Sequence, residues 1–376
     1  MKYYIIAGEA SGDLHASRLI RAIKQHDAEA IFRVWGGDLM AAEGAVLVKH
    51  YRDLAFMGFI EVAANIRTIL RNMKFCKRDL LAFKPDLLIL VDYPGFNIPM
   101  AKFAHNHAIK TAYYISPQVW AWKEGRVKTL RNVIDKMLVI LPFEKEFYAK
   151  WNYPVTYVGH PLIEIIEGYK MHKTDHNLRK KLDIASDKKI VALLPGSRKQ
   201  EIQKKLPVML EATAGMKDVV FVVGQAPSLP DSIIESYTKG FSEVRILKGD
   251  TYGLLSIADA AVVTSGTATL ETALFGIPEV VCYKGSPISY AIAKRVIKVK
   301  YISLVNLIMN KPVVKELIQE EMNAANIRTA VHEILFNEAK RAEMISDFSD
   351  LKSILQAGGN ASEKAAMEIK TMLECS

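Results

Sequence analysis

Two short turns in the second half of the sequence combine glycine with hydroxyl side chains, which are residue types that hold a phosphate group. Each turn follows an apolar run, 190–194 or 260–264, and precedes a helix-length segment. Free backbone N–H groups and the positive end of a helix dipole attract an anion at such a place. The candidate residues are Gly196, Ser197 and Arg198 in the first turn, and Ser265, Gly266, Thr267 and Ala268 in the second. Together they predict a site for a diphosphate, as in a nucleotide-sugar, although each turn alone also fits an ordinary strand-to-helix connection.

Two loops in the first half carry candidate catalytic residues. Loop 8–13, after the first apolar run, contains Ser11 and Asp13, and loop 92–97 contains Asp92 and Asn97. Asp92 comes directly after the very apolar run 87–91. A carboxylate that emerges from a buried strand loses solvation, which raises its pKa toward that of a general base. The alternative interpretation is that Asp13 and Asp92 only cap turns or helices.

An apolar and basic surface is predicted between residues 54 and 78. Segment 54–60 is dense in large apolar residues, and Arg67 and Arg71 recur at helical spacing beside an apolar stripe in the segment that follows. The apolar residues proposed to contact lipid are Phe56, Met57, Phe59 and Ile60. Such a surface fits contact with an anionic membrane, and a core helix with a solvated charged face is the alternative.

Loop 116–123 is a third candidate loop in the first half. It is expected to expose Trp120 and Trp122 beside Lys123 and Arg126. Exposed tryptophan next to cations fits carbohydrate stacking, the edge of a membrane or a packed lid.

The elements that must position these residues are predicted as two series of buried strands that alternate with helices. The expected strands are 3–7, 31–35, 87–91, 111–115, 137–141 and 155–158 in the first half, and 190–194, 219–223, 244–247, 260–264 and 279–283 in the second. Continuous apolar strands between helices indicate parallel sheets covered on both faces. The fold class is therefore α/β, with two doubly wound, Rossmann-like domains, 1–165 and 166–338, and ligands in an interdomain cleft at the carboxyl ends of the strands.

Composition narrows the functional class. The 376 residues carry a formal net charge of +9, which predicts an acidic partner, and no apolar run approaches the roughly 20 residues of a membrane span. Three scattered cysteines and the absence of a signal peptide predict a cytoplasmic protein. The sequence has neither a G-x-G-x-x-G fingerprint nor a P-loop, and no D-x-D pair for a metal-held diphosphate. We therefore expect no metal and no cofactor.

At this point the residues match a known family. The chain resembles lipid-A-disaccharide synthase from its first strand to about Asn323. The motifs that carry the resemblance are G-E-A-S-G-D at 8–13, Met57-Gly58 with Glu61-Val62, D-x-P-x-F-N at 92–97, Ser116-Pro117 with V-W-A-W at 119–122, L-P-F-E at 141–144, V-G-H at 158–160, L-P-G-S-R at 194–198 with Glu201, S-G-T-A at 265–268 with Leu270-Glu271, A-K-R at 293–295, S-L-V-N-L at 303–307 and K-E-L at 315–317. Tyr93 and Gly95 depart from the usual pattern but leave Asp92 and Asn97 in place.

The resemblance implies a GT-B glycosyltransferase that inverts the anomeric centre. It would transfer 2,3-diacylglucosamine from UDP to the 6-hydroxyl of 2,3-diacylglucosamine 1-phosphate, with Asp92 as candidate base and Arg198 on the departing diphosphate. It also adds residues to the UDP site, namely Glu201, Glu271, Asn306 and Glu316. Peripheral contact with the inner face of the anionic inner membrane, homodimerisation and a return of the last helices, from about 339 to 376, to the first domain are further expectations.

Two alternatives remain at this stage. One is another GT-B enzyme that acts on soluble UDP-N-acetylglucosamine, such as a 2-epimerase. The other is a non-enzymatic basic protein that binds lipid or nucleic acid and would show salt-dependent binding without nucleotide-sugar preference. The second leaves the phosphate turns and Asp92 without a role, so we expect no nucleic-acid partner.

Overall fold

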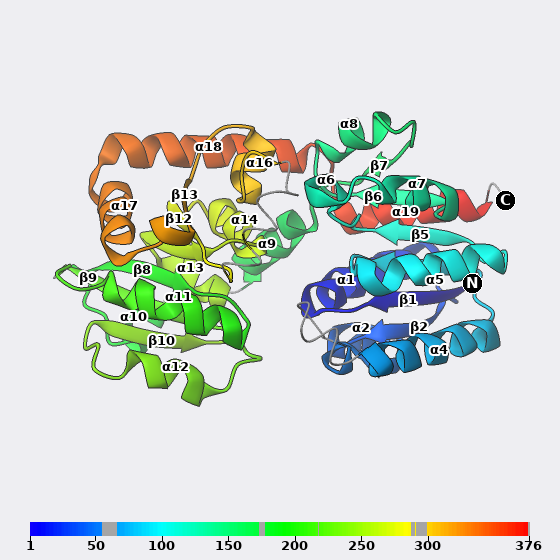
Figure 1. Ribbon diagram of the computed structural model, residues 1–376, viewed down its shortest axis with the longest axis horizontal. Coiled ribbons are helices and arrows are strands. Elements are labelled where there is room, and N and C mark those ends of the chain that lie inside the picture. Colours follow the sequence, from blue (N-terminus) through cyan, green and yellow to red (C-terminus); the bar gives the residue numbers. More distant parts are fainter. Residues whose placement is uncertain (55–65, 173–176, 217, 287–289, 291–298, 375–376) are drawn as a thin grey trace. The chain divides into compact units, whose positions relative to one another are not determined.

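The computed structural model describes residues 1–374 except 55–65, 173–176, 217, 287–289 and 291–298. The chain divides into two compact units, and each is an α/β unit around a parallel sheet (Figure 1). Unit 1 comprises Met1–Pro161 and Leu355–Ser376, and unit 2 comprises Leu162–Ile354. The first unit thus ends at 161 where the sequence suggested 165, and the chain rejoins it at 355 where the sequence suggested about 339.

Unit 1 is built on a seven-stranded sheet in the order β3-β2-β1-β4-β5-β6-β7, and every described pairing is parallel. Its strands are β1 (Lys2–Ala7), β2 (Ile31–Gly36), β3 (Val46–His50), β4 (Leu87–Val91), β5 (Thr111–Tyr114), β6 (Lys136–Val139) and β7 (Thr156–Tyr157). All five residues of β4 are buried. A strand covered on both faces needs an unbroken apolar sequence, which is why the run Leu-Leu-Ile-Leu-Val lies at the centre.

Helices cover both faces of this sheet and form two separate apolar cores. They are α1 (Ala10–His26), α2 (Asp38–Ala42), α4 (Ile66–Phe83), α5 (Pro94–Asn106), α6 (Val119–Trp122), α7 (Arg126–Val133), α8 (Glu144–Ala149) and α19 (Ala361–Glu374), with a short 3₁₀ turn at Tyr51–Asp53. Helices α1 and α19 share one core, in which Leu19 and Ile20 are buried with Ala365 and Ile369. Helices α4, α5 and α7 contribute to the other core. It contains the strand side chains that point to the opposite face of the sheet.

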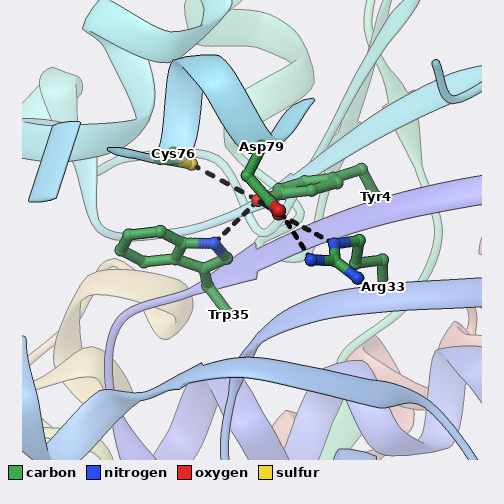
Figure 2. A network of polar contacts seen from close by, with 5 residues as sticks. All are labelled: Tyr4, Arg33, Trp35, Cys76 and Asp79. Atoms are coloured by element: carbon green, nitrogen blue, oxygen red, sulfur yellow. Dashed lines mark hydrogen bonds and ion pairs between the residues drawn. The ribbon is translucent and has the colours of Figure 1, made fainter. Parts of the chain in front are cut away.

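A buried polar network ties the carboxyl half of α4 to the sheet (Figure 2). The Tyr4 hydroxyl donates to Asp79 at 2.7 Å, and the Trp35 indole N–H donates to the same hydroxyl at 2.7 Å. Arg33 completes the network with a two-pronged contact to the Asp79 carboxylate, Nε to Oδ2 at 2.9 Å and a terminal nitrogen to Oδ1 at 2.6 Å. Such planar, charge-assisted pairs fix geometry as well as energy, so α4 is held in one orientation at this end.

Unit 2 is built on a six-stranded sheet in the order β10-β9-β8-β11-β12-β13, again with every described pairing parallel. Its strands are β8 (Lys189–Leu194), β9 (Val219–Gln225), β10 (Val244–Lys248), β11 (Ala260–Thr264), β12 (Glu279–Tyr283) and β13 (Lys315–Ile318). Its helices are α9 (Pro161–His172), α10 (Leu178–Lys181), α11 (Lys199–Glu211), α12 (Asp231–Thr238), α13 (Thr251–Ile257), α14 (Thr267–Phe275), α16 (Leu304–Met309), α17 (Ala324–Phe336) and α18 (Glu338–Gln356), with a 3₁₀ turn at Gln319–Glu321.

Two edge strands, β3 and β13, have no counterpart in the sequence prediction. Their side chains are mostly half-buried, in contrast to the buried β4 and β11. An edge strand with one solvated face does not need a continuous apolar run, which explains why the sequence pattern misses β13, whereas β3 begins with the apolar run Val46-Leu47-Val48 and was missed without such a reason. Within the residues that the structure describes, no helix combines the length and apolarity needed to cross a bilayer.

Candidate active site

Loops 8–13 and 92–97 of unit 1 and the two phosphate turns of unit 2 meet in pairs. Each pair lies at the point where the strand order of its sheet reverses. In unit 1 the reversal lies between β1 and β4, whose last residues Ala7 and Val91 are direct partners. In unit 2 it lies between β8 and β11, where Leu194 pairs with Val263. Ligands of open parallel sheets bind outside the carboxyl ends of the strands at such reversals. The topology therefore brings loop 8–13 beside loop 92–97, and loop 195–198 beside loop 265–268.

Asp92 leaves β4 in an unusual backbone conformation. Its φ is +42° and that of Tyr93 is +46°, so two consecutive residues other than glycine occupy the left-handed region. Tyr93 is held there because its ring lies against Gly8, where an added Cβ would come within 2.3 Å of the ring, and its hydroxyl donates to the Leu54 carbonyl at 3.0 Å. Strained positions of this kind persist only where the surroundings fix them, and they concentrate at functional sites.

The electrostatic surroundings of Asp92 suit a proton acceptor. The pKa of Asp92 is raised to about 7, chiefly by burial and in addition by the negative charges of Glu9 and Glu144, while a backbone hydrogen bond at Tyr93 opposes the rise. A carboxylate with a pKa near neutrality takes a proton from a hydroxyl far better than one with the ordinary value. The side chain is only partly covered, so it is accessible to a ligand.

The other three predicted catalytic residues of unit 1 occupy different kinds of place. Asn97 is fully buried, and its amide group donates to the carbonyls of Val91 at 3.1 Å and Asp92 at 2.7 Å, which holds the end of β4. Asp13 is also buried and accepts from the backbone N–H groups of Gly37, Leu39 and Met40, so it caps α2. Ser11 is exposed in the first turn of α1. Asn97 and Asp13 thus position backbone, whereas Ser11 is accessible.

Glu144 is a residue of this site to which the sequence assigned no role. It is buried, and its two oxygens accept from the Ser116 hydroxyl at 2.6 Å, the Trp120 indole at 3.2 Å and the backbone N–H groups of Ile140 and Leu141. Burial raises the pKa of Glu144 to about 7, although these donors lower it. The motif L-P-F-E contains the glutamate, but only the fold shows that it anchors the loop after β5.

The prediction that both tryptophans of this loop are exposed is wrong for Trp120. Its side chain is 7% exposed and packs edge-on against Phe143 while its N–H is bound by Glu144. Trp122 is 43% exposed, with the Lys123 ammonium 4.0 Å from its ring centre. Of the two, only Trp122 is available to a ligand or a surface.

The first phosphate turn of unit 2 is organised around Glu201. Gly196 has φ +116°, and a Cβ there would lie 2.2 Å from a carboxylate oxygen of Glu201, so glycine is required. The same carboxylate accepts from the Ser197 backbone N–H at 3.2 Å and lies 3.7 Å from the Arg198 guanidinium. Glu201 therefore shapes the turn and orients Arg198, whose half-exposed side chain remains accessible.

The second phosphate turn opens helix α14. Gly266 is the N-cap, with φ +145°, and Thr269 returns its hydroxyl to the Gly266 carbonyl at 2.9 Å. Ser265 is part-buried and Thr267 is exposed, so Gly266, Thr267 and Ala268 lie at the positive end of the helix. Glu271, one turn on, accepts from the Tyr252 hydroxyl at 2.7 Å, and burial raises its pKa.

Lys205 is a second residue that sequence reasoning missed. It lies on α11, is 4% exposed, and its ammonium group donates to the Thr264 hydroxyl at the carboxyl end of β11. Burial lowers the pKa of Lys205, while the charge of Glu201 raises it. A lysine buried at the end of a strand beside a phosphate turn provides a positive charge where an anion is expected. Its position in the sequence, one turn after Glu201, gives no sign of this because lysines are common on solvated helix faces.

Asn306 and Glu316 are hydrogen-bonded to each other and hold the start of α16. The Glu316 carboxylate accepts from the backbone N–H groups of Ile302 and Ser303 and from the Asn306 amide at 3.0 Å. Asn306 also exchanges hydrogen bonds with the backbone of Val314. Both residues line a cavity of about 420 Å³ in unit 2. Their hydrogen bonds are internal to the protein, so they shape this wall.

The predicted membrane surface falls partly outside the described residues, because Phe56, Met57, Phe59 and Ile60 belong to segment 55–65. Helix α4 is described. It buries Asn72, Cys76 and Leu80 and leaves Ile66 and Leu70 at 47% and 58% exposure. Arg67 and Arg71 are exposed on the same stretch. The apolar stripe of α4 is thus exposed at Ile66 and Leu70 and half-buried at Ile69 and Met73.

Comparison with known proteins identifies the family. A family model described as lipid-A-disaccharide synthetase matches residues 3–369. The chain belongs to the lipid-A-disaccharide synthase family. Lipid-A-disaccharide synthase of Syntrophus aciditrophicus is 41% identical over 98% of this chain and 97% of its own length, and that of Geobacter sulfurreducens is 37% identical over 98% and 96%. The protein is accordingly a glycosyltransferase of lipid A biosynthesis.

Solved structures confirm the GT-B type of fold. A UDP-N-acetylglucosamine 2-epimerase from Neisseria meningitidis bound to UDP-N-acetylglucosamine superposes with a TM-score of 0.66 at 13% identity, covering all of both chains. The glycosyltransferase of kitacinnamycin superposes with a TM-score of 0.66 at 16% identity and 99% coverage of both chains. At such low identity the likeness concerns fold alone, so it does not favour an epimerase activity for this member of the lipid-A-disaccharide synthase family.

Proposed function

We propose that the protein transfers 2,3-diacylglucosamine from UDP to the 6-hydroxyl of 2,3-diacylglucosamine 1-phosphate, with inversion. The proposal rests on the state of Asp92. This carboxylate is partly covered, lies at the strand reversal of unit 1, and has its pKa raised to about 7. An acceptor hydroxyl is a poor nucleophile, and a base near its proton is what this transfer needs.

In the proposed step Asp92 takes the proton of the acceptor 6-hydroxyl as that oxygen attacks the anomeric carbon of the donor. The new β-1,6 bond forms as the bond from the anomeric carbon to the UDP oxygen breaks. UDP leaves with the electron pair of that bond, and Asp92 later releases its proton to water. Asn97 and Asp13 act as positioning residues, because they hold the backbone at the ends of β4 and β2.

Unit 2 supplies the groups that would stabilise the departing diphosphate. Arg198, Lys205 and the amides at the start of α14 place positive charge and donors around one strand reversal. We propose that these groups suffice without a metal or an organic cofactor. Glu271, held by Tyr252, would bind the ribose hydroxyls of UDP.

Helix α4 supports the proposal of peripheral membrane contact. Exposed Ile66 and Leu70 lie beside exposed Arg67 and Arg71, and the network around Asp79 fixes the other end of the helix (Figure 2). Apolar side chains next to cations are what an anionic bilayer surface attracts. We place the enzyme on the cytoplasmic face of the inner membrane, where acylated substrates reside. A homodimer is proposed from the family resemblance alone, and light scattering in detergent tests it.

The deciding experiment measures UDP release in detergent micelles. Purified enzyme is given UDP-2,3-diacylglucosamine with and without 2,3-diacylglucosamine 1-phosphate, and UDP-N-acetylglucosamine serves as the soluble control donor. Release that requires both acylated substrates and yields the disaccharide by mass spectrometry supports the proposal. Conversion of UDP-N-acetylglucosamine to its 2-epimer, with no product from the acylated pair, contradicts it.

A further inference from the structure

The corner between α6 and α7 gathers two cations around one exposed aromatic ring. The Lys123 ammonium lies 4.0 Å from the centre of the Trp122 ring, and the Arg126 guanidinium carbon lies 5.9 Å from it. Trp122 is 43% exposed. Among the described residues neither cation has an ion pair of its own, and the carboxylate nearest to them in the sequence is Glu124. The corner therefore presents two positive charges that no described acidic side chain neutralises.

The strand that leads into this corner, β5, contacts Asp92 at its carboxyl end. The backbone N–H of Asp92 points at the carbonyls of Tyr114 and Ile115, 3.4 and 3.3 Å away, at the point where β5 ends. The Tyr113 hydroxyl donates to the Asp92 carbonyl. Because β4 and β5 are neighbours in the sheet, the loop after β5 leaves at the same edge as the candidate base.

The corner is also rigidly supported. The Glu144 carboxylate accepts hydrogen bonds from the Ser116 hydroxyl at 2.6 Å and from the Trp120 indole. These two bonds hold the segment that precedes Trp122. Arg126 begins α7, and its backbone N–H returns to the Lys123 carbonyl at 3.0 Å. Cations on a fixed frame lose little freedom when they bind an anion, so their charge is available for recognition.

The chemistry of the three side chains matches a phosphorylated sugar. A tryptophan face stacks on the apolar side of a pyranose ring, and Arg and Lys bind the oxygens of a phosphate monoester through charge-assisted hydrogen bonds. Burial lowers the pKa of Lys123, and the nearby charge of Arg126 lowers it further. Burial raises the pKa of the Tyr113 hydroxyl well above its usual value, and Arg126 lies close enough for its charge to oppose that rise. Two like charges that raise each other's energy are relieved when an anion binds between them.

We propose that Trp122, Lys123 and Arg126 form the subsite for the phosphate monoester of the acceptor sugar, next to the Asp92 that takes its proton. The inference rests on the proposed function for the identity of the acceptor. In this arrangement the 1-phosphate binds at the corner, and the 6-hydroxymethyl group, on the other carbon that flanks the ring oxygen, presents its hydroxyl to Asp92. The enzyme thereby selects the phosphorylated acceptor by charge.

The kinetic test compares 2,3-diacylglucosamine 1-phosphate with the same acceptor lacking its phosphate, in neutral detergent micelles without phospholipid. The double variant Lys123→Ala/Arg126→Ala is expected to lose about 10- to 100-fold in kcat/KM on the phosphorylated acceptor, the size of one or two charge-assisted contacts. Its rate on the dephosphorylated acceptor and its KM for the UDP-sugar stay near those of wild type. Lys128→Ala, an exposed lysine of the same helix, is the matched control. Equal losses on both acceptors, or no loss on either, overturn the inference.

A binding measurement separates this inference from the proposed function. Glucosamine 1-phosphate is titrated into wild type, the double variant and Trp122→Phe while tryptophan fluorescence is followed. A saturable change in wild type that the double variant loses, and that glucosamine does not cause, supports the subsite even if the acylated pair gives no turnover. Trp122→Phe, which lacks the fluorophore of this corner, shows whether the change comes from Trp122. Absence of binding to wild type overturns it. A double variant with normal acceptor kinetics that no longer co-sediments with phosphatidylglycerol vesicles would show a membrane contact instead, which also overturns it.

Discussion

The two strand reversals of this enzyme have the same topology and opposite chemistry. In unit 1 the reversal between β1 and β4 carries acids, with Glu9, Asp92 and Glu144 close enough for their charges to interact. In unit 2 the reversal between β8 and β11 carries small residues and cations, with Arg198 and Lys205 beside the start of α14.

In the proposed mechanism, this difference divides one reaction between the carboxyl edges of two similar sheets. Clustered acids raise one another's pKa and produce a base, whereas clustered donors stabilise an anion that leaves. The sheet fixes only where the loops emerge, and the loop residues decide which charge is favoured there. Three of the four changes below each weaken one side of the contrast and leave the other side intact, and the fourth, at Glu279, tests a buried acid outside both reversals.

Replacement of Asp92 by asparagine is expected to have the largest effect. The amide keeps the shape of the side chain but does not accept the proton, so kcat should fall by about 10³-fold, within the range for loss of a general base. UDP affinity, measured by calorimetry, should remain that of wild type because the cations of unit 2 are untouched. A fall of less than tenfold in kcat with normal folding by circular dichroism would assign the base elsewhere.

Lys205→Met should weaken the binding of UDP at the strand reversal of unit 2. Loss of the buried ammonium group beside Thr264 is expected to reduce UDP affinity by about 10- to 100-fold, because one charge-assisted contact with the diphosphate is removed. The melting temperature should not fall, since methionine fills the same space without a charge to desolvate. Lys204→Met, on the exposed face of the same helix, is the control. Equal UDP affinity in both variants would exclude Lys205 from the site.

Glu9→Gln tests whether the acids of unit 1 act on one another. The negative charge of Glu9 disfavours the ionised form of Asp92, so its removal lowers the pKa of Asp92 from about 7. The ascending limb of kcat/KM against pH should therefore move to lower pH by a fraction of a unit, and more enzyme should be active at pH 6. A limb that stays in place or moves to higher pH would contradict the coupling.

Glu279 provides a buried acid away from either reversal. It begins β12, is 0% exposed, and neither oxygen has a hydrogen-bond partner in the described structure; burial raises its pKa well above 4.5. Above pH 4.5 the unfolded chain releases this proton and the folded chain keeps it, so stability falls as pH rises, by at most about 1.4 kcal/mol per pH unit. Glu279→Gln should remove that slope.

The Glu279 test is a comparison of thermal unfolding at pH 5 and pH 8. The gain in stability of Glu279→Gln over wild type should be larger at pH 8, with kcat unchanged at both pH values. A gain that does not depend on pH would mean that Glu279 keeps the same charge in both states. An unchanged kcat would show that a raised pKa marks a catalytic acid only when it lies at the carboxyl edge of the sheet.

The sequence predicts the central part of both sheets well, because a strand covered on both faces has to be apolar throughout. Strands β4, β11 and β12 lie where the apolar runs placed them. The edge strand β13 is missed for the opposite reason. The start of β13, Lys315-Glu316, is polar, and its glutamate serves to hold α16 rather than to fill a core.

The candidate site could be predicted only as far as local sequence determines it. Asp92 and Arg198 follow apolar runs directly, so their place at a strand end was visible. Glu144 and Lys205 lie on helices, and their importance comes from what they contact across the fold, Ser116 and Thr264 respectively. No spacing in the sequence encodes those contacts. The burial of Trp120 was unpredictable for the same reason, since its partner is Glu144.

The C-terminal helix gives this enzyme an unusual order of assembly. The chain leaves unit 1 after Pro161 and returns at Leu355, and backbone meets backbone where it does so: a Cβ on Gly358 would lie 2.2 Å from the Cα of Gly159. Helix α19 then packs on α1. On the ribosome, the first helix made is therefore the last to be covered. Unit 2 can fold while synthesis continues, but unit 1 cannot be completed before the segment that begins at Leu355 has been made. A prematurely terminated chain thus carries an uncovered apolar groove, which marks it for chaperones and proteases before it can occupy a membrane.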